Sequence, residues 1–180
     1  PSGSQGVLIS HTDVNIARQS PADYLNGMEQ IIKSLIDQAK ESLADFSPSQ
    51  IIGLTCATTG STVIPVDAHL NALGLKDTNN LDAQAWLWKD HTSYKEAELI
   101  TQKAKELRPQ FLERCGGTYS SEWFWSKILH LKNVAPETFE QAYSFVELCD
   151  YLPAVLAGKE KPEFGAHPPP RLLQQPGNFH

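Results

Sequence analysis

Two short stretches of this sequence carry side chains that could hold a polar ligand. The first, Thr58-Thr59-Gly60-Ser61, is a hydroxyl-rich turn that directly follows an apolar run. Backbone amides and hydroxyl groups in such a turn can hydrogen-bond a polar ligand. A hairpin turn without a ligand has the same composition, because Gly and Ser are ordinary turn residues. It is not a phosphate-binding loop, since neither the GxxxxGK[ST] nor the GxGxxG spacing occurs.

The second stretch, residues 86–92, reads Trp-Leu-Trp-Lys-Asp-His-Thr. A tryptophan ring offers an apolar face on which sugar C–H groups can stack. Lys89, Asp90 and His91 could hydrogen-bond the hydroxyl groups of a polyol. The alternative is that one tryptophan belongs to the core and the charged side chains form a solvated helix entrance. Spacing alone leaves both interpretations open.

A third stretch, residues 119–127, is dense in aromatic side chains, a composition that more often indicates packing than a ligand site. Trp123 and Lys127 are four residues apart and share a helix face, whereas Trp125 points elsewhere. Signatures of other chemistries are missing from the sequence: it has no HxxxH pair, no CxxC pair and no GxSxG turn. The residues therefore indicate a polar turn and a Trp-rich pocket, without recognisable catalytic machinery.

The elements that must position these stretches are predicted from periodicity and capping signals. Ser20 and Pro21 begin an amphipathic helix of about 20 residues, which we expect to pack on an apolar surface. Buried strands are predicted at 51–56 and 62–66, joined by the hydroxyl-rich turn, and a short strand at 144–148. Further helices are predicted over 93–107, near 121–131, from 136 and over 151–157, with a loop at 68–82. The pattern predicts a mixed α/β domain whose sheet is too small to be complete.

Composition narrows the classes of partner. The 180 residues include 15 basic and 21 acidic side chains, a formal net charge of −6, so a nucleic-acid backbone would be repelled and no nucleic-acid partner is expected. No apolar run approaches the roughly 20 residues of a membrane-spanning helix, and no membrane partner is expected. The three cysteines are far apart, which argues against a zinc site or disulfide framework and predicts a cytoplasmic protein with reduced thiols.

The order of several motifs resembles a known family, the FGGY carbohydrate kinases, and within it the bacterial ribulokinases. The similarity spans roughly residues 19–158. TTGS alone is weak, but LWKDHT and YSSEWFW in this order are highly specific. In chain order the motifs are Ile51-Ile52-Gly53, Thr58-Thr59-Gly60-Ser61-Thr62 with Pro65-Val66-Asp67, Leu87-Trp88-Lys89-Asp90-His91-Thr92, Gly116-Gly117, Tyr119-Ser120-Ser121-Glu122-Trp123-Phe124-Trp125 with Lys127-Ile128-Leu129-His130, and Glu147-Leu148-Cys149-Asp150-Tyr151-Leu152-Pro153.

The resemblance implies a ribonuclease-H-like, actin-like kinase with a mixed sheet flanked by helices, whose N-terminal domain holds the sugar and whose C-terminal domain lies toward ATP and Mg²⁺. The implied reaction is ATP-dependent phosphorylation of the terminal hydroxyl of L-ribulose, in arabinose catabolism. A relative acting on xylulose, ribitol or another pentitol is the alternative. By position Gly60 and Trp88 match residues that line the sugar pocket. The other candidate substrate-binding residues in the matched motifs are Thr59, Ser61, Lys89, Asp90 and Glu122.

Three departures from the family pattern limit what we expect of this chain. The family's first Asp-x-Gly-Thr hairpin has no counterpart here, and Ala57 stands where the family usually has Asp. The family's catalytic Asp and ATP-binding domain correspond to positions beyond this chain. We therefore expect an irregular segment at 1–18, a partial sugar-kinase domain at 19–158 and a disordered Pro-rich tail at 159–180.

These departures predict that the isolated chain is inactive and does not fully bind ATP, Mg²⁺ or another metal. They leave two hypotheses: the chain is a fragment of a kinase whose function is defined only in the parent enzyme, or it is a non-catalytic sugar-binding module. Apolar surface left uncovered by the missing parts would favour homo-oligomers.

Overall fold

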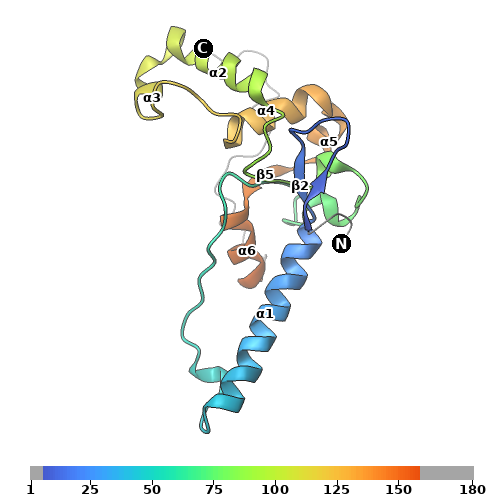
Figure 1. Cartoon of the computed structure of the whole chain (residues 1–180), viewed down its shortest axis with the longest axis vertical. Helices are drawn as coiled ribbons and strands as arrows, with labels where there is room; N and C mark the ends of the chain where they lie inside the picture. Colours follow the sequence, from blue (N-terminus) through green and yellow to red (C-terminus); the bar gives the residue numbers. More distant parts are fainter. Residues whose placement is uncertain (1–5, 159–180) are drawn as a thin grey trace.

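The computed structural model describes residues 6–158, whose centre is a five-stranded sheet (Figure 1). The strand order is β1-β2-β4-β3-β5, and each neighbouring pair is antiparallel. The mixed sheet predicted from the resemblance is therefore wrong for the described residues. The strands are β1 (Leu8–Ile9), β2 (Ala17–Gln19), β3 (Val63–Val66), β4 (Ala85–Trp86) and β5 (Ser144–Glu147).

Strand β3 is the most deeply buried part of the sheet. All four of its residues are buried, and it pairs with β5 over its whole length, from Val63 opposite Glu147 to Val66 opposite Ser144. Its β-branched residues suit a pleated surface packed on both sides. The strands predicted at 62–66 and 144–148 are confirmed, although Leu148 begins a helix instead of ending the strand.

Alternation along β3 divides the core into two clusters on the two faces of the sheet. Val63 packs with Trp86 and Phe145 against helices α4 and α5. Ile64 and Val66 pack on the other face against helix α6. The helices are α1 (Pro21–Ser42), α2 (Tyr94–Leu107), α3 (Pro109–Glu113), α4 (Phe124–Val134), α5 (Pro136–Gln141) and α6 (Leu148–Leu156). The predicted helices are thus confirmed, with α6 beginning three residues earlier than expected.

Helix α1 forms as predicted, but the expectation that it packs on an apolar surface is wrong for most of its length. It extends away from the sheet (Figure 1), and Pro21 is its one buried residue. Ile31 and Leu35 on its apolar side are 62% and 59% exposed. The 3.6-residue spacing of apolar residues correctly predicts the helix, but none of the described elements covers the apolar stripe that this spacing forms along α1.

The buried strand predicted at 51–56 is also wrong. After the short 3₁₀ turn η2 (Pro48–Gln50), the chain returns toward the sheet as an irregular segment, and Ile52 is fully exposed (Figure 1). An apolar run becomes a buried strand only when a neighbour takes its backbone hydrogen bonds. None of the described strands pairs with this segment.

The chain ends differ from expectation where they are described. Within the segment 1–18, predicted to be irregular, β1 and most of β2 form strands at one edge of the sheet. The predicted Pro-rich tail at 159–180 lies outside the described residues. The predicted loop at 68–82 contains two 3₁₀ turns, η3 (Leu73–Leu75) and η4 (Leu81–Ala83), the second ending just beyond it. No described helix is both long and apolar enough to cross a membrane.

Candidate functional site

The two stretches singled out by their chemistry meet at one pocket of about 470 Å³. Thr59 comes from the hydroxyl-rich turn, and Trp88 and Lys89 come from the chain that leaves β4. These segments lie far apart in the sequence, and antiparallel pairing of β3 with β4 brings them together. The complete lining is Gln19, Tyr24, Ala57, Thr58, Thr59, Leu87, Trp88, Lys89, Leu148 and Leu152.

Glu147, at the end of β5, anchors the hydroxyl-rich turn. The Ser61 hydroxyl donates to Glu147 Oε1, and the Thr62 amide donates to Glu147 Oε2 at 2.8 Å. The Leu148 amide donates to the Thr62 carbonyl at 2.9 Å, which ties the same turn to the start of α6. A carboxylate that accepts two such bonds holds the turn at a fixed place beside the pocket.

Lys127 of α4 connects the two segments that form the walls of the pocket, the hydroxyl-rich turn and the chain that leaves β4. Its ammonium group donates to the Ser61 carbonyl at 2.9 Å and to the Leu87 carbonyl at 2.7 Å. The side chain is 1% exposed. Burial disfavours the charged form and, with nearby Arg18, lowers the pKa of Lys127 to about 7.

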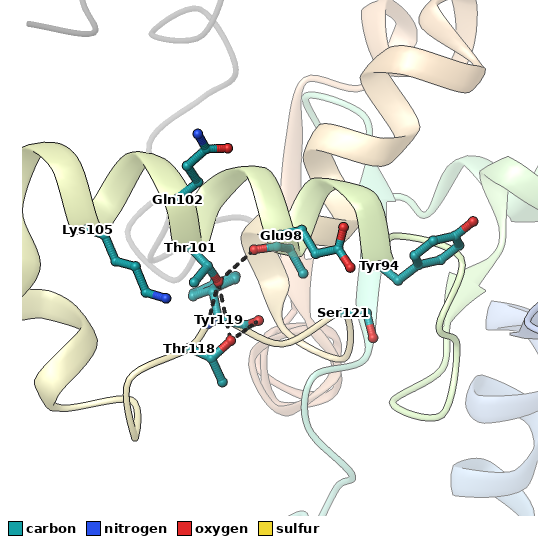
Figure 2. A pocket seen from close by; sticks show the side chains of 9 residues that line it. Tyr94, Glu98, Thr101, Gln102, Lys105, Thr118, Tyr119 and Ser121 are labelled. Atoms are coloured by element: carbon teal, nitrogen blue, oxygen red, sulfur yellow. Dashed lines mark hydrogen bonds between the residues drawn. The ribbon is translucent and has the colours of Figure 1, made fainter.

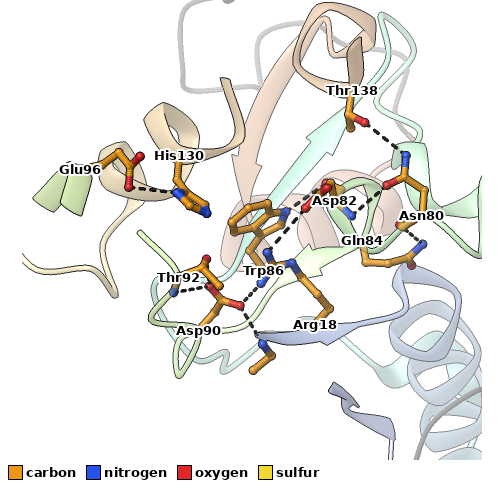
Figure 3. A network of polar contacts seen from close by, with 11 residues as sticks. Arg18, Asn80, Asp82, Gln84, Trp86, Asp90, Thr92, Glu96, His130 and Thr138 are labelled. Atoms are coloured by element: carbon orange, nitrogen blue, oxygen red, sulfur yellow. Dashed lines mark hydrogen bonds and ion pairs between the residues drawn. The ribbon is translucent and has the colours of Figure 1, made fainter. Parts of the chain in front are cut away.

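Asp90 fixes the Trp88 wall through a buried network (Figure 3). Its carboxylate accepts from the Ala17 amide at 2.7 Å and from the Thr92 hydroxyl at 2.5 Å, and it forms an ion pair with Arg18. The Arg18 guanidinium carbon lies 3.3 Å from the centre of the Trp86 ring. Burial lowers the pKa of Arg18 to about 9 despite the carboxylates nearby. The network attaches the segment after β4 to the neighbouring strand β2.

Gln19 and Tyr24 form a third side of the pocket where β2 leads into α1. The Tyr24 hydroxyl donates to Gln19 Oε1, and burial raises the pKa of Tyr24 to about 12. This bond orients the Gln19 side chain through its oxygen and leaves its amide nitrogen as a donor. Leu148 and Leu152 of α6 add apolar surface, so the pocket combines a few polar groups with an apolar lining, as ligand sites do.

The residues predicted for the site divide into two groups. Thr59, Trp88 and Lys89 line the pocket. The other four do not. Ser61 and Asp90 are buried behind the walls, in the contacts described above, and Gly60 is an exposed neighbour of Thr59.

The fourth, Glu122, lies with His91 outside this pocket, and its Oε1 is 3.8 Å from the His91 Nε2. The aromatic stretch that contains Glu122 serves packing in part. Trp123 meets Tyr119 edge to face, with ring centres 4.9 Å apart, while Trp125 is 44% exposed.

A second hollow, of about 410 Å³, opens along α2 (Figure 2). Its lining includes Glu98, Gln102 and Lys105 of α2 and Thr118 and Tyr119 of the loop after α3. The Tyr119 amide donates to the Thr101 hydroxyl at 2.9 Å, so the loop is bound to the helix. None of the seven predicted site residues lines this hollow.

The lining of the first pocket suits a neutral polyol better than a nucleotide. Lys89 is its one basic residue, and no carboxylate lines it. Among residues 6–158, no three His, Cys, Asp or Glu side chains are grouped to bind a metal ion. With one basic residue and no carboxylate, the lining of this pocket does not fit a magnesium–triphosphate group, and it has no carboxylate that could accept a proton from a sugar hydroxyl.

Sequence reasoning missed the groups that hold the pocket from behind. Lys127 and Glu147 both stand in motifs that resemble the family, but the sequence predicts a site role for neither. Both are single charges within apolar surroundings, Lys127 on the buried face of α4 and Glu147 at the end of an apolar strand. A buried lone charge must find polar partners, and that signal could have identified both.

Comparison with known proteins finds relatives of this chain among the sugar kinases. A ribulokinase of Vibrio parahaemolyticus is 36% identical over 149 residues, which are 81% of this chain and 26% of that protein. A ribulokinase of Shouchella clausii is 37% identical over 144 residues, 79% of this chain and 25% of that protein. The chain thus spans about a quarter of the length of these curated relatives.

Solved structures show the same fold. A "xyloylose kinase" from Brucella ovis aligns with a TM-score of 0.62 at 18% identity, covering 82% of this chain and 27% of that one. A gluconate kinase from Lactobacillus acidophilus aligns with a TM-score of 0.55 at 20% identity, covering 83% and 27%. The predicted fold class, the actin-like N-terminal domain of a sugar kinase, is confirmed. Residues 3–166 match the N-terminal domain of the FGGY family of carbohydrate kinases, and the chain belongs to that family.

Proposed function

We propose that this chain supplies the acceptor-sugar side of an ATP-dependent carbohydrate kinase whose substrate is a pentulose, L-ribulose. The observation that carries the proposal is the shared pocket, in which Thr59 and Trp88 line one hollow of about 470 Å³. That volume lies within the range of small-molecule sites. The relatives described as ribulokinases support L-ribulose over other sugars.

In this proposal each lining residue has a role set by its chemistry. The Trp88 ring, which is 42% exposed, provides the face on which the sugar carbon chain stacks. Thr58, Thr59 and Lys89 offer hydroxyl groups and an ammonium to the sugar hydroxyls, and Gln19 offers its amide nitrogen. Together these residues bind and orient the acceptor, as phosphoryl transfer requires.

Phosphoryl transfer itself also needs a base and a site for ATP and Mg²⁺, which the described pocket does not provide. We therefore expect no turnover when the isolated chain is mixed with L-ribulose, ATP and Mg²⁺ and ADP release is measured. Measurable sugar-dependent ADP release would contradict this expectation. The protein is expected to act in the cytoplasm, in arabinose catabolism.

Calorimetric titration of the chain with L-ribulose tests the pocket. Trp88→Ala should weaken binding about tenfold or more, because it removes the stacking face. Trp125→Ala is the matched control, since Trp125 is similarly exposed at 44% but lies outside the pocket. Equal affinities of Trp88→Ala and the unsubstituted chain would overturn the pocket assignment. Tighter binding of xylulose or ribitol would instead change the substrate to that sugar.

A second candidate is a non-catalytic module that associates through its uncovered surface. The observation that favours it is the exposed apolar stripe of α1, with Ile31 and Leu35 both more than half exposed. Size-exclusion chromatography over a concentration series separates the two. A monomer that binds L-ribulose favours a sugar-binding module. A concentration-dependent dimer that Leu35→Glu dissociates favours association through α1.

A further inference from the structure

The further inference concerns Lys127, a buried cation behind the pocket. Its ammonium contacts two backbone carbonyls, those of Ser61 and Leu87, and the side chain is 1% exposed. Desolvating an ammonium group is costly, and a methionine of similar length would fill the same space without that cost. Space filling alone therefore does not account for a lysine at this position.

The place of the two carbonyls indicates what the ammonium does. Strands β3 and β4 are antiparallel and pair at Val63 opposite Trp86. Continuing that register would set Thr62 opposite Leu87 and Ser61 opposite Trp88, but the ladder stops at Val63 and Trp86. The Lys127 ammonium bonds the carbonyls of Ser61 and Leu87 just beyond this point. It links the two segments where the β3–β4 ladder ends and so sets their separation, while the Leu87 amide pairs with the Ala17 carbonyl of β2.

The separated segments are the walls of the pocket. Beyond Ser61 in the direction away from β3 lie Thr59 and Thr58, and beyond Leu87 lie Trp88 and Lys89. The hollow therefore opens where the paired strands diverge. On its other side the turn is held by Glu147, so Ser61 is fixed through both its hydroxyl and its carbonyl.

We propose that Lys127 is a positioning residue that sets the spacing between the hydroxyl-rich turn and Trp88, so that a sugar can enter between them. Lys127 does not line the pocket and does not touch the sugar. It acts through the Ser61 and Leu87 carbonyls. The proposal rests on the proposed function, because the spacing matters for binding only if the pocket holds a sugar.

The test compares Lys127→Met with Ile128→Ala in the full chain. Ile128, the next residue of α4, is 2% exposed in the core and does not line this pocket, so its truncation lowers stability without touching the walls. L-ribulose affinity is measured by calorimetry well below each unfolding midpoint. We expect Lys127→Met to weaken binding about tenfold or more and Ile128→Ala to stay within about twofold, even where Ile128→Ala lowers the midpoint as much or more.

Hydrogen exchange read by mass spectrometry supplies a local signature. In Lys127→Met, exchange should accelerate in 58–62 and 87–90 together, since both segments lose one tether, whereas Ile128→Ala should not single out these two segments. Should Lys127→Met fail to fold, Lys127→Gln is used instead. Its amide keeps a donor but is too short to reach both carbonyls.

The outcomes separate the two claims. If the unsubstituted chain binds L-ribulose and Lys127→Met binds it equally well, the positioning role is overturned and the proposed function stands. If affinity falls only in proportion to stability in both variants, Lys127 is structural and the proposal is again overturned. If the unsubstituted chain binds no pentulose or pentitol, the proposed function fails, and the sugar-positioning role fails with it.

Discussion

Apolar side chains occur both beside the pocket walls and in the arm formed by α1 with residues 51–56, yet only the walls are fixed by tertiary contacts. Behind the walls, Lys127, Glu147 and Asp90 each bond backbone groups of segments far away in the sequence. In the arm, the apolar stripe of α1 and Ile52 face solvent. The difference shows that a local apolar pattern sets the type of an element, while its burial depends on a partner elsewhere.

The largest loss in the free energy of unfolding is expected from Asp90→Ala, because Asp90 alone makes several of the contacts that hold one wall. Asp90→Ala removes an ion pair with Arg18 and the bonds to the Ala17 amide and Thr92. It leaves a guanidinium that is 2% exposed without its main carboxylate partner. Removing one member of a buried ion pair typically costs about 3–5 kcal/mol. Urea unfolding followed by circular dichroism measures the loss.

Lys89→Ala is the control for this substitution, because Lys89 is a neighbouring charge on the same segment but is exposed. Its free energy of unfolding should change by no more than about 0.5 kcal/mol. If Asp90→Ala costs less than about 1.5 kcal/mol, the buried network does not hold the wall and the contrast with the arm loses its basis.

A smaller effect, which depends on pH, is expected from Lys127. In the folded chain the pKa of Lys127 is about 7, lowered by burial from an ordinary value near 10.5. Between these pH values the unfolded chain binds more protons than the folded chain, so the free energy of unfolding rises with pH. One group contributes at most about 1.4 kcal/mol per pH unit. Arg18 and Tyr24 titrate at about 9 and about 12, so the clean window is pH 7–8.5.

The measurement is the difference in unfolding free energy between the unsubstituted chain and Lys127→Met across that window. Arg18, Glu147 and Glu122 also act on the Lys127 ammonium, and all three remain in the variant. The Cys149 thiol, whose pKa is raised by burial, also remains, so its titration is shared by both chains and largely cancels. A difference that grows from pH 7 to 8.5 confirms the lowered pKa, and a flat difference contradicts it.

The sequence was sufficient for features that depend on nearby residues. The capping pattern at Ser20 and Pro21 located the start of α1, and the β-branched run at 62–66 located β3. The resemblance brought together Thr59 and Trp88 as parts of one site. The sequence pattern failed for residues 51–56, because apolar composition cannot show whether a strand has a neighbour. It also could not find Lys127 as a link, since that role depends on two carbonyl groups whose positions only the fold determines.

The smallest change in the free energy of unfolding is expected from a substitution in the arm, at Leu35. Leu35 is 59% exposed, so Leu35→Ala removes little buried apolar surface, and Ala favours a helix at least as well as Leu. The free energy of unfolding of a dilute sample should change by no more than about 0.5 kcal/mol. A loss of about 2 kcal/mol or more is typical of a buried leucine and would mean that this stripe is covered in solution.

Repeating the unfolding of Leu35→Ala and of the unsubstituted chain at several protein concentrations then decides what covers the stripe. A loss that appears only at high concentration indicates a second copy of the chain, because only intermolecular packing depends on concentration. A loss independent of concentration would contradict the arrangement of α1 in this structure and, with it, the contrast between the arm and the walls.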